Sequence, residues 1–590
     1  MNEIPNNKKI ALEIDGVHIH AEKGMTIMEA ADSMGIRIPR LCFHPQLSTL
    51  GACRVCIVEV EGMRNPVASC AYPVSEGMKI KTSSPSLRKL RRDIIELLLD
   101  NHPRECQTCE RDGNCELQNL AYSLGVRERL YAGERKKFKI EKSSPAVIRD
   151  AERCILCGRC VRVCEEVQGV CNLGVQGRGF RNVVAPAHQG NMVDSACIHC
   201  GQCINVCPTA ALVEHSDTEI VLQALDNPDL HVMVQTAPSI RAAVGEGFGF
   251  APGTPTTGKM VTALRLMGFS KIFDTNIGAD LTIIEESAEF IARLKSNEKL
   301  PLITSCSPGW ISFMERFYPE MIPLASTCKS PMSMLSTLIK TCYAEKKGLD
   351  PKKIFVVGIM PCTAKKYEAR RPEHLSPWGA PYTDAVLTTR EFIWLAKCLG
   401  INYHNLPDGE FDSPLGMSSG ASDIFGATGG VMEAALRTAY EKVTGETCPN
   451  LNFLEVRGVS GVKEATIELK GTSINVAVAN GLHNAKTVLN GILSGEKKLH
   501  LVEIMACPGG CVAGGGQPYP PEGMYVLDPN LARLRAKALY SIDSHKQLRK
   551  SHDNPEIQRL YAECLGEPNG HKSHELLHTT YTPKTPRGVR

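Results

Sequence analysis

The sequence predicts a multidomain protein that combines small α+β domains in its first third with a large α/β domain after them. Three observations support this fold class. With 590 residues, the chain is long enough for several domains. Many of its cysteines gather in spaced groups before residue 215. From about residue 220, apolar strand-like runs alternate with helical segments, the pattern of parallel strands joined by helical crossovers.

Composition and charge give no sign of a nucleic-acid partner, a membrane partner or secretion. The formal net charge is +3 and 43% of the residues are hydrophobic, as in an ordinary soluble protein without a strong field for nucleic acid or a membrane surface. No apolar run approaches the roughly 18–20 residues of a spanning helix. Residues 1–9 have no apolar segment like that of a secretory signal, so we expect a cytoplasmic protein.

The 25 cysteines indicate metal binding. Secreted disulfide scaffolds are normally short, whereas this chain is long and holds dense C-x-x-C pairs, which in a reducing compartment are typical of metal ligands. Zinc is the competing metal. A repeated spacing of three cysteines plus one fits iron–sulfur clusters better than the two-plus-two pattern of zinc sites.

Residues 1–84 are predicted to form a β-rich domain. Residues 10–19 have the pattern of a hairpin with a tight Asp-Gly turn, and Thr26 is placed to cap a helix over residues 27–34. Four spaced thiolates suit a 2Fe–2S cluster, and the expected ligands are Cys42, Cys53, Cys56 and Cys70. The order of hairpin, helix and cysteine loop resembles the plant-type ferredoxin fold, a β-grasp domain, although the cysteine spacing differs.

Residues 85–125 are predicted to be mainly helical, with apolar residues at helical intervals over residues 87–100. The three spaced cysteines that follow would leave one iron of a 4Fe–4S cluster without a protein ligand. A lone histidine is usually not a ligand, but this one lies beside the thiols, and a neutral imidazole can complete the set. The expected ligands are His102, Cys106, Cys109 and Cys115.

Residues 145–215 contain a clear internal repeat. The run C-x2-C-x2-C-x3-C begins at Cys154 and recurs 43 residues later at Cys197. In the bacterial tandem ferredoxin pattern, the fourth cysteine of each run ligates the other cluster. We therefore expect two 4Fe–4S clusters, one held by Cys154, Cys157, Cys160 and Cys207, the other by Cys197, Cys200, Cys203 and Cys164.

The predicted α/β domain, residues 220–530, carries three cysteine loops at residues 304–310, 360–368 and 505–516. The first two follow strand-like runs, and open α/β sheets place their sites where strand ends converge on one crevice. In the third loop, Cys507 and Cys511 would share one face of a helix. Its five glycines let the backbone approach a bulky group, although such a glycine-rich pair can also be incidental.

The remaining segments carry weaker signals. Most of the cysteines outside the spaced groups are expected to be ordinary buried thiols. They are Cys171, Cys328, Cys342, Cys398, Cys448 and Cys564. Residues 531–590 are predicted to form a helical, basic C-terminal domain with a polar tail.

Together, the three cysteine loops resemble those of the iron-only (FeFe) hydrogenases, whose motifs are T-S-C-C-P-x-W, M-P-C-x-x-K-x-x-E and M-x-C-x-x-G-C-x-x-G. Loops 360–368 and 505–514 match fully. The resemblance covers nearly the whole chain. Residues 85–125 resemble the histidine-ligated cluster domain that these enzymes share with the large iron–sulfur subunit of respiratory NADH dehydrogenase. The resemblance implies an enzyme that reversibly interconverts dihydrogen with protons and electrons.

The resemblance also implies which residues hold the cofactor of this family, the H-cluster. Cys362, Cys507 and Cys511 would bind a 4Fe–4S cube, which the Cys511 thiolate joins to a di-iron unit carrying CO, cyanide and a bridging dithiolate. Lys365 would contact a cyanide. The pocket would be lined by Pro238, Ser239, Met360 and Met505.

Cleavage of dihydrogen also needs a nearby base and an exit for the proton. Groups of staged acidity can form such a path, for example a thiol with a pKa of about 8.5 and carboxylates of about 4. By resemblance the path consists of Cys306, Glu286, Ser326, Glu289 and Arg293. Without the resemblance, a solvated helix face would explain the two glutamates equally well. Electrons would leave separately through the four accessory clusters, one 2Fe–2S and three 4Fe–4S.

The loop at residues 304–310 departs from the family motif, because Ser307 replaces the second cysteine, a ligand of the cube. A serine hydroxyl is a poor ligand for iron in these clusters. Three solutions are open: Ser307 binds as an alkoxide, Cys306 turns inward, or another thiol substitutes, with Cys328 the best candidate. We expect Cys306 to stay on the proton path and Ser307 or Cys328 to complete the cube.

Two other functional classes compete with a hydrogenase. The first is an electron-transfer subunit, which would lack the C-terminal cysteine loops that are present here. The second is a hydrogen-sensing or cluster-assembly relative with low activity, and the lack of a sensor domain after the large domain counts against sensing. Residues 576–581, L-L-H-T-T-Y, resemble the tail of multi-subunit, nicotinamide-linked hydrogenases. We therefore expect flavoprotein subunits that pass electrons to NAD(P), with ferredoxin as the alternative partner.

Overall fold

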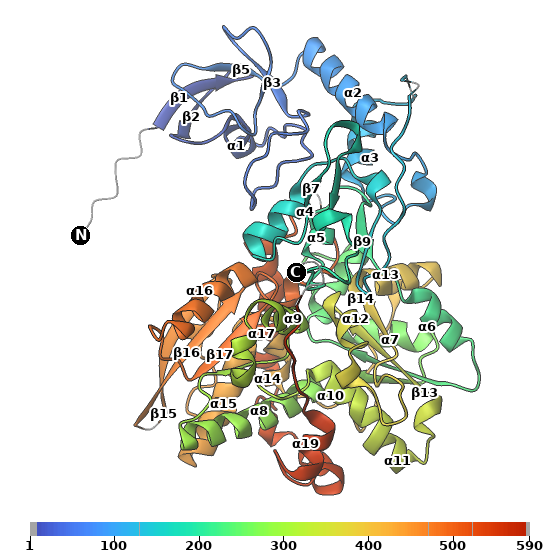
Figure 1. The fold of residues 1–590 in the computed structure, drawn as a ribbon, viewed down its shortest axis with the longest axis vertical. Helices are drawn as coiled ribbons and strands as arrows, with labels where there is room; N and C mark the ends of the chain where they lie inside the picture. The colour runs from blue at the N-terminus through green and yellow to red at the C-terminus, as the bar shows by residue number, and fades with distance from the viewer. Residues whose placement is uncertain (1–8, 129, 132, 470, 522, 586–590) are drawn as a thin grey trace.

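The computed structural model describes residues 9–128, 130–131, 133–469, 471–521 and 523–585. Small domains occupy one end of the molecule and a large domain the other (Figure 1). The large domain has two lobes, each built on a four-stranded sheet. The prediction of a multidomain protein with mixed α and β structure is confirmed.

The N-terminal domain is a five-stranded sheet with strand order β2-β1-β5-β3-β4. The predicted hairpin is present, because Asp15 and Gly16 have φ values of 50° and 84° and turn β1 back onto β2. The predicted helix α1 (Ile27–Ser33) begins at Thr26, whose hydroxyl accepts a hydrogen bond from Glu29 N in a capping box. The strands are β1 (Lys9–Ile14), β2 (Val17–Glu22), β3 (Ile57–Val60), β4 (Val67–Ala68) and β5 (Lys79–Lys81).

The next segment is helical, as predicted. Helix α2 (Pro85–Asp100) begins at Ser84, whose hydroxyl accepts a hydrogen bond from Leu87 N. Helix α3 (Glu116–Ser123) packs against α2. The three cysteines expected to hold a cluster lie between these two helices.

The tandem segment repeats in backbone conformation as well as in sequence. Gly158 and Gly201 have φ values of 69° and 71°, which a side chain would disfavour, and each is followed by a short helix. Two antiparallel strand pairs, β6–β9 and β7–β8, close the segment. Its elements are α4 (Arg159–Arg162), α5 (Gln202–Asn205), β6 (Val147–Arg149), β7 (Gly174–Gln176), β8 (Val183–Ala185) and β9 (Leu212–Glu214).

The two sheets of the large domain differ in strand direction. The first, β11-β10-β13-β14, is entirely parallel, whereas the second, β12-β17-β16-β15, contains the antiparallel hairpin β15–β16. The predicted parallel strands with helical crossovers are therefore present, but in two sheets. The strands are β10 (His231–Thr236), β11 (Lys271–Asp274), β12 (Leu302–Ile303), β13 (Ile354–Met360), β14 (Ala385–Thr388), β15 (Val462–Leu469), β16 (Thr472–Asn480) and β17 (Leu501–Met505).

Helices cover both sheets and join the lobes. Helices α6 (Thr218–Leu225), α7 (Thr257–Leu266) and α13 (Thr389–Cys398) pack on the first sheet. Helices α9 (Pro308–Phe317), α15 (Gly430–Thr444) and α16 (Leu482–Leu493) pack on the second. The long helix α8 (Asn276–Ser296) contacts both α10 (Pro331–Leu338) and α15, so it is buried on most of its surface. None of the helices in the described ranges combines the length and apolar content that a bilayer-spanning segment needs.

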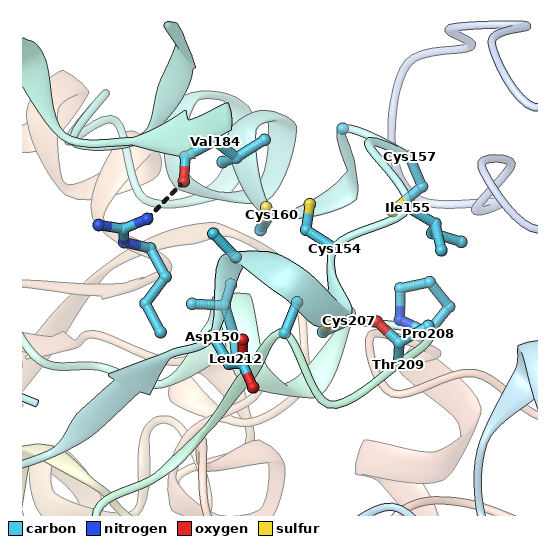
Figure 2. A pocket seen from close by; sticks show the side chains of 14 residues that line it. Asp150, Cys154, Ile155, Cys157, Cys160, Val184, Cys207, Pro208, Thr209 and Leu212 are labelled. Carbon is cyan, nitrogen blue, oxygen red and sulfur yellow. Dashed lines mark hydrogen bonds between the residues drawn. The ribbon is translucent and has the colours of Figure 1, made fainter. Parts of the chain in front are cut away.

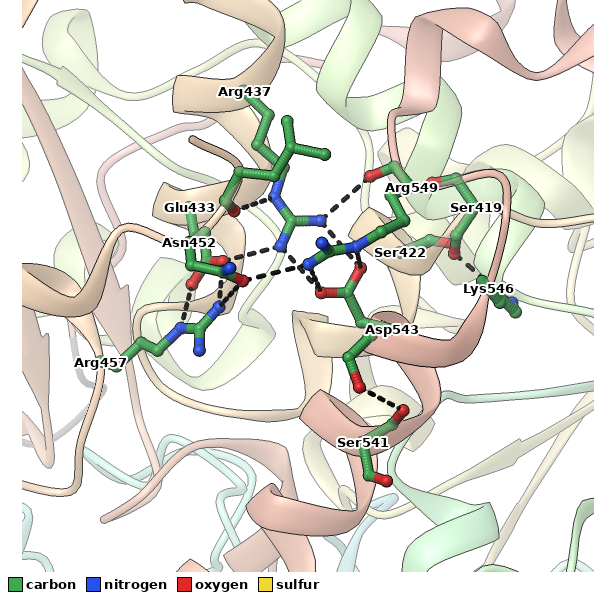
Figure 3. Close-up of polar contacts among 12 residues, drawn as sticks. Ser419, Ser422, Glu433, Arg437, Asn452, Arg457, Ser541, Asp543, Lys546 and Arg549 are labelled. Atoms are coloured by element: carbon green, nitrogen blue, oxygen red, sulfur yellow. Dashed lines mark hydrogen bonds and ion pairs between the residues drawn. The ribbon is translucent and has the colours of Figure 1, made fainter. Parts of the chain in front are cut away.

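The C-terminal segment is helical, as predicted, and docks on the large domain. Its helices are α17 (Pro529–His545), α18 (Pro555–Leu560) and α19 (His571–Leu577). Arg437 on α15 is buried and forms ion pairs with Glu433, at 2.7 Å, and with Asp543 of α17, at 2.9 Å (Figure 3). A buried charge of this kind needs its partners in place, so the network holds α17 in one position.

A disulfide between Cys342 and Cys564 also attaches the C-terminal segment to the large domain, with the two Cα atoms 6.1 Å apart. Each of these cysteines lies in a short π-helical turn, and the packing of the two turns brings the thiols together. The bond corrects the expectation that Cys342 and Cys564 are ordinary buried thiols. Cys171 and Cys398 also differ from that expectation, since both are exposed.

Candidate active site

The three cysteine loops follow β12, β13 and β17 and meet between the two sheets. Backbone contacts join them: Gly516 N donates to Pro361 O at 2.8 Å, and Ala506 N donates to Ser307 Oγ at 3.3 Å. The expected convergence of strand ends therefore occurs. The crevice lies between two sheets, because β13 belongs to the first sheet and the other two strands to the second.

The glycines of the third loop permit close backbone approach. A Cβ on Gly514 would lie 2.2 Å from Pro361 O, and a Cβ on Gly515 would lie 2.2 Å from Cys200 O. Real Cβ atoms cannot approach so closely, so these positions need glycine. The expected helical arrangement of Cys507 and Cys511 is wrong: Cys507 lies in a loop after β17, and Cys511 begins a 3-10 helix, Cys511–Ala513.

Cys362, Cys507 and Cys511 gather at this crevice. Removal from water raises the pKa of all three, that of Cys511 to about 12, and the Cys362 thiol adds to the effect on the other two. Thiols in such a place do not ionise readily by themselves, whereas a bound metal cation would stabilise their thiolates. The donor set therefore fits an iron–sulfur group.

Lys365 is a cation close to these thiols. Its Nζ pairs with Glu368 Oε2 at 2.7 Å and lies 3.4 Å from Cys306 O. Burial raises the pKa of Cys362 and of Cys511, and the charge of Lys365 opposes that rise. The ammonium is thus held over the loops where an anionic ligand of the cofactor would need a partner.

The four expected pocket residues lie at strand ends around the crevice. Met360 ends β13 and Met505 ends β17, and each retains only 2% of its surface. Pro238 and Ser239 follow β10. Gln517 Nε2 lies 3.4 Å from Ser239 O and 3.3 Å from Cys511 O, so it ties the β10 loop to the third cysteine loop.

The residues of the expected proton path also lie together. Glu286 and Glu289 are on α8, and Glu286 is buried, so the alternative of a solvated helix face does not hold for it. Removal from water raises the pKa of Glu286 to about 7, against hydrogen bonds from Ser326 and Ser305. Ser326 Oγ donates to Glu289 Oε2 at 3.2 Å.

Cys306 and Arg293 stand at the two ends of this path. Burial raises the pKa of the Cys306 thiol, and Glu286 is the charge that raises it most. At the other end, Arg293 Nη2 pairs with Glu289 Oε1 at 2.6 Å. The thiol, two carboxylates and a hydroxyl thus form one series from the cysteine loops to Arg293.

Ser307 and Cys328 lie in different surroundings. Ser307 Oγ accepts from Ala506 N, beside Cys507. The Cys328 thiol is buried within 4.8 Å of a Glu289 carboxylate oxygen and a His578 ring nitrogen. Burial raises its pKa, and the charges of Glu286 and Glu289 raise it further. Cys328 therefore lies beside the carboxylates.

The expected ligands of the accessory clusters gather in four groups. Cys56 Sγ lies 3.4 Å from Cys70 Sγ, and Cys53 N donates to Cys42 Sγ at 3.5 Å. One cavity is lined by Cys154, Cys157, Cys160 and Cys207 (Figure 2). A second cavity is lined by Cys164, Cys197, Cys200 and Cys203. Both tandem sets thus include a cysteine from the other copy.

His102 shares a cavity with Cys106, Cys109 and Cys115. Burial lowers its pKa to about 4, so the ring is neutral, the form that binds a metal. Its Nδ1 is buried without a hydrogen-bond partner among the described residues. An orphaned imidazole nitrogen beside three thiols fits the expected cluster.

The groups are arranged in sequence across the molecule. Arg162 Nη2 donates to both Cys42 O and Cys157 O, which links the first group to the tandem segment. Cys115 Sγ lies 3.6 Å from Pro208 O, which links the His102 group to it. On the other side, Thr363 Oγ1 donates to His199 O and Gln202 Nε2 to Ala513 O. The tandem segment therefore lies between the N-terminal groups and the crevice.

The sequence did not single out several polar residues around the crevice and the expected proton path. Glu285 accepts hydrogen bonds from Tyr561 and His578, and Tyr581 OH donates to Cys328 O at 3.3 Å. Two of these residues, His578 and Tyr581, lie in the segment 576–581. By sequence alone, that segment served only as a sign of partner subunits. Gln517 carried no motif signal.

Models of known protein families match the chain domain by domain. The model of the C-terminal domain of the iron-only hydrogenase large subunit matches residues 230–515, and that of the iron hydrogenase small subunit matches residues 529–584. A 2Fe–2S iron–sulfur cluster binding domain matches residues 7–85. The NADH-ubiquinone oxidoreductase-G iron–sulfur binding region matches residues 91–129, and the ferredoxin-like domain of NADH-quinone oxidoreductase subunit 3 matches residues 144–213.

Individual relatives agree with these matches. The NADP-reducing hydrogenase subunit HndD of Solidesulfovibrio fructosivorans is 48% identical over 97% of this chain and 98% of its own. Iron hydrogenase 1 of Clostridium pasteurianum is 40% identical over 96% of this chain and 99% of its own. An apo FeFe hydrogenase variant from Chlamydomonas reinhardtii, 44% identical, superposes with a TM-score of 0.56 over 63% of this chain and 100% of its own. The chain belongs to the iron-only (FeFe) hydrogenase family.

Proposed function

We propose that this protein reversibly interconverts dihydrogen with protons and electrons at an H-cluster held by Cys362, Cys507 and Cys511. One observation carries the proposal: three cysteine loops from two sheets meet at a crevice from which a thiol, two carboxylates and a hydroxyl lead to Arg293. When bound, the di-iron unit supplies the low-valent metal at which the dihydrogen bond is cleaved or formed.

The side chains around the cluster bind and orient it. Cys511 would hold both parts of the cofactor, and the Lys365 ammonium would contact a cyanide. Met360, Met505, Pro238 and Ser239 exclude water from the pocket, which strengthens every electrostatic interaction inside it.

Protons move through the series that begins at Cys306. The buried carboxyl of Glu286, with a pKa of about 7, both accepts and releases a proton near neutral pH. Ser326 connects it to Glu289, and Arg293 stabilises the Glu289 carboxylate. These residues keep proton movement separate from the route of the electrons.

Ser307 is our choice for the fourth position of the cube. Its hydroxyl accepts a hydrogen bond from Ala506 N, next to Cys507. A ligand of the same cube has to lie close to Cys507. Cys328 is the less suitable of the two candidates, because its thiol lies among the carboxylates of the proton path. Cys306 remains free for proton transfer in this arrangement.

The cysteine groups before residue 215 would hold one 2Fe–2S and three 4Fe–4S clusters, which would supply a route for electrons. We assign the 2Fe–2S cluster to residues 1–84, the histidine-ligated cluster to 85–125 and two clusters to 145–215. Residues 220–530 form the catalytic domain, and 531–590 a small-subunit-like tail. The contacts of Arg162 and Gln202 support this order, because they link neighbouring groups.

The electron acceptor is proposed from the relatives. HndD is named as a subunit of an NADP-reducing hydrogenase, and it matches this chain over nearly its whole length. We therefore propose cytoplasmic flavoprotein subunits that reduce NAD(P), with ferredoxin as the alternative. Purification from native cells tests this: a co-purifying flavin subunit and NAD(P) reduction support the first, and efficient exchange with ferredoxin alone supports the second.

The central test uses the protein matured with its cofactor under anaerobic conditions. We expect infrared bands of bound CO and cyanide and hydrogen-dependent reduction of a viologen dye. Cys507→Ser should lose both, whereas Cys398→Ser, at an exposed thiol outside the crevice, should keep both. A fully iron-loaded chain with neither bands nor turnover would instead support the electron-transfer alternative; bands with little turnover would support a sensor.

A further inference from the structure

The C-terminal tail brings a histidine to the proposed proton path. Helix α19 packs against α10, and the residue after it, His578, is buried. Its Nδ1 lies 2.8 Å from Thr327 Oγ1, and its Nε2 lies 3.1 Å from Glu285 Oε2. Thr327 Oγ1 lies 3.4 Å from Glu289 Oε2. A continuous hydrogen-bonded series therefore joins Glu289 to Glu285.

We infer that His578 is a proton acceptor for Glu289, reached through the Thr327 hydroxyl and oriented by Glu285. The inference rests on the proposed function, since Glu289 is a member of the proposed proton path. It adds a branch that begins at Glu289 and leads into the C-terminal tail.

The partners of Glu285 determine which nitrogen of His578 carries hydrogen. Tyr561 OH donates to Glu285 Oε1 at 2.5 Å, and Asn569 N donates to Oε2 at 2.7 Å. A carboxylate is an acceptor only, so Nε2 of His578 must donate to it. In the neutral ring, Nδ1 is then the acceptor. The single Thr327 hydroxyl hydrogen points to Glu289 Oε2 while Glu289 is a carboxylate, and to Nδ1 when a protonated Glu289 donates to Thr327 Oγ1.

This orientation permits a balanced proton transfer. A protonated Glu289 donates its proton to Thr327 Oγ1 while the Thr327 hydroxyl proton passes to His578 Nδ1. The O–H bond of Glu289 breaks, the N–H bond of His578 forms, and no electron moves. The resulting imidazolium lies against the Glu285 carboxylate, which stabilises its charge.

The other groups around His578 are consistent with this role. Arg293 pairs with Glu289 Oε1, which leaves Oε2 facing Ser326 and Thr327. The Cys328 thiol lies within 4.8 Å on one side. The exposed ring of His574 stacks on His578 with centroids 4.5 Å apart, so the branch ends beside the surface.

Thr327→Val tests the inference most directly. Valine has nearly the same shape and keeps the backbone N–H that donates to Glu289, but it removes the hydroxyl. The His578–Glu285 contact that docks the tail stays in place. In the matured holoenzyme we expect about tenfold slower hydrogen oxidation, an altered pH profile, and unchanged CO and cyanide bands. Thr327→Ser should restore the rate.

His578→Gln should show the same loss, and His574→Gln, at the exposed neighbouring ring, should not.

A second readout is the infrared band of the protonated Glu289 carboxyl, identified by its absence in Glu289→Gln. After a pH rise it should decay more slowly in Thr327→Val than in the wild type. Rates within twofold of the wild type with an unchanged band in Thr327→Val, or a loss that Thr327→Ser does not restore, would overturn the inference. A wild-type protein without CO bands or turnover would instead contradict the proposed function.

Discussion

At the scale of single residues, burial raises the pKa of Glu286, the first carboxyl after Cys306 on the proposed path. Glu286 retains 2% of its surface, and its pKa rises to about 7. A carboxyl with a raised folded-state pKa binds its proton more tightly in the folded chain than in the unfolded one. The contribution of Glu286 to folding stability therefore decreases as pH rises from about 4.5 through 7.

Glu286→Gln separates the two consequences of that pKa. Glutamine is neutral like the protonated carboxyl, so at pH 8 the variant should unfold at a higher temperature than the wild type, and at pH 4 at about the same temperature. It cannot carry a proton, so hydrogen turnover should decrease by about a hundredfold. Thermal unfolding and dye-linked turnover measure the two effects. A variant less stable than the wild type at pH 8 would contradict the pKa argument.

Cys306→Ala tests the assignment of the first loop. If the thiol is a proton carrier, the variant should keep the CO and cyanide bands and lose about a hundredfold or more of the turnover. Ser307→Cys, which introduces the family's thiol, should keep the cluster and the activity. Loss of the bands in Cys306→Ala would mean that Cys306 is a ligand and that the proton leaves by another first step.

At the scale of elements, the C-terminal helices depend on contacts that are distant in sequence. The ion pairs of Arg437 hold α17, and the Cys342–Cys564 bond holds the turn before α19. The ion pairs and the disulfide attach the C-terminal segment to the large domain, and this segment places His578 beside α8. The position of His578 therefore depends on the large domain.

Cys564→Ser tests the contribution of the disulfide. The bond joins residues 222 positions apart, and removal of such a cross-link typically lowers the free energy of unfolding by about 2–4 kcal/mol. Denaturant unfolding of the oxidised protein should show this decrease, and Cys398→Ser should not. Equal stability of Cys564→Ser and the wild type, both without reductant, would contradict the prediction.

At the scale of the whole molecule, the N-terminal cysteine groups lie far from the crevice, with the tandem segment between them (Figure 1). The N-terminal domain contacts the tandem segment through the loop between α1 and β3: Arg162 donates to Cys42 O, and Ser48 donates to Glu166. The crevice loops contact the tandem segment through Thr363 and Gln202. The Chlamydomonas structure, which matches 63% of this chain, shows that the fold can exist with fewer domains.

Deletion of residues 1–83 should remove partner coupling and retain the chemistry. The deletion keeps Ser84, which caps α2, and should lower the iron content by about two atoms, one 2Fe–2S cluster. Dye-linked hydrogen turnover should remain within severalfold of the full chain, because the crevice is intact. Reduction of NAD(P) through the partner subunits should be lost; its retention would show that electrons leave elsewhere.

Much of the site was predictable from sequence, because ligand spacing is a local property. Short runs such as the one at Cys154 and the motif around Cys362 hold their ligands close in the chain, and helix and turn signals at Thr26 and Asp15 are equally local. The cysteine groups gather in the structure as that spacing indicated. The roles of these ligands remain predictions.

Sequence by itself determined the class of chemistry, the order of the domains and the local elements, since these depend on neighbouring residues. Only the tertiary structure decided that the crevice lies between two sheets, that Cys342 bonds to Cys564, and that His578 lies against Glu285. The residues in these contacts are 222 and 293 positions apart in the two pairs. Such contacts form because packing brings distant surfaces together, and no local pattern records which surfaces meet.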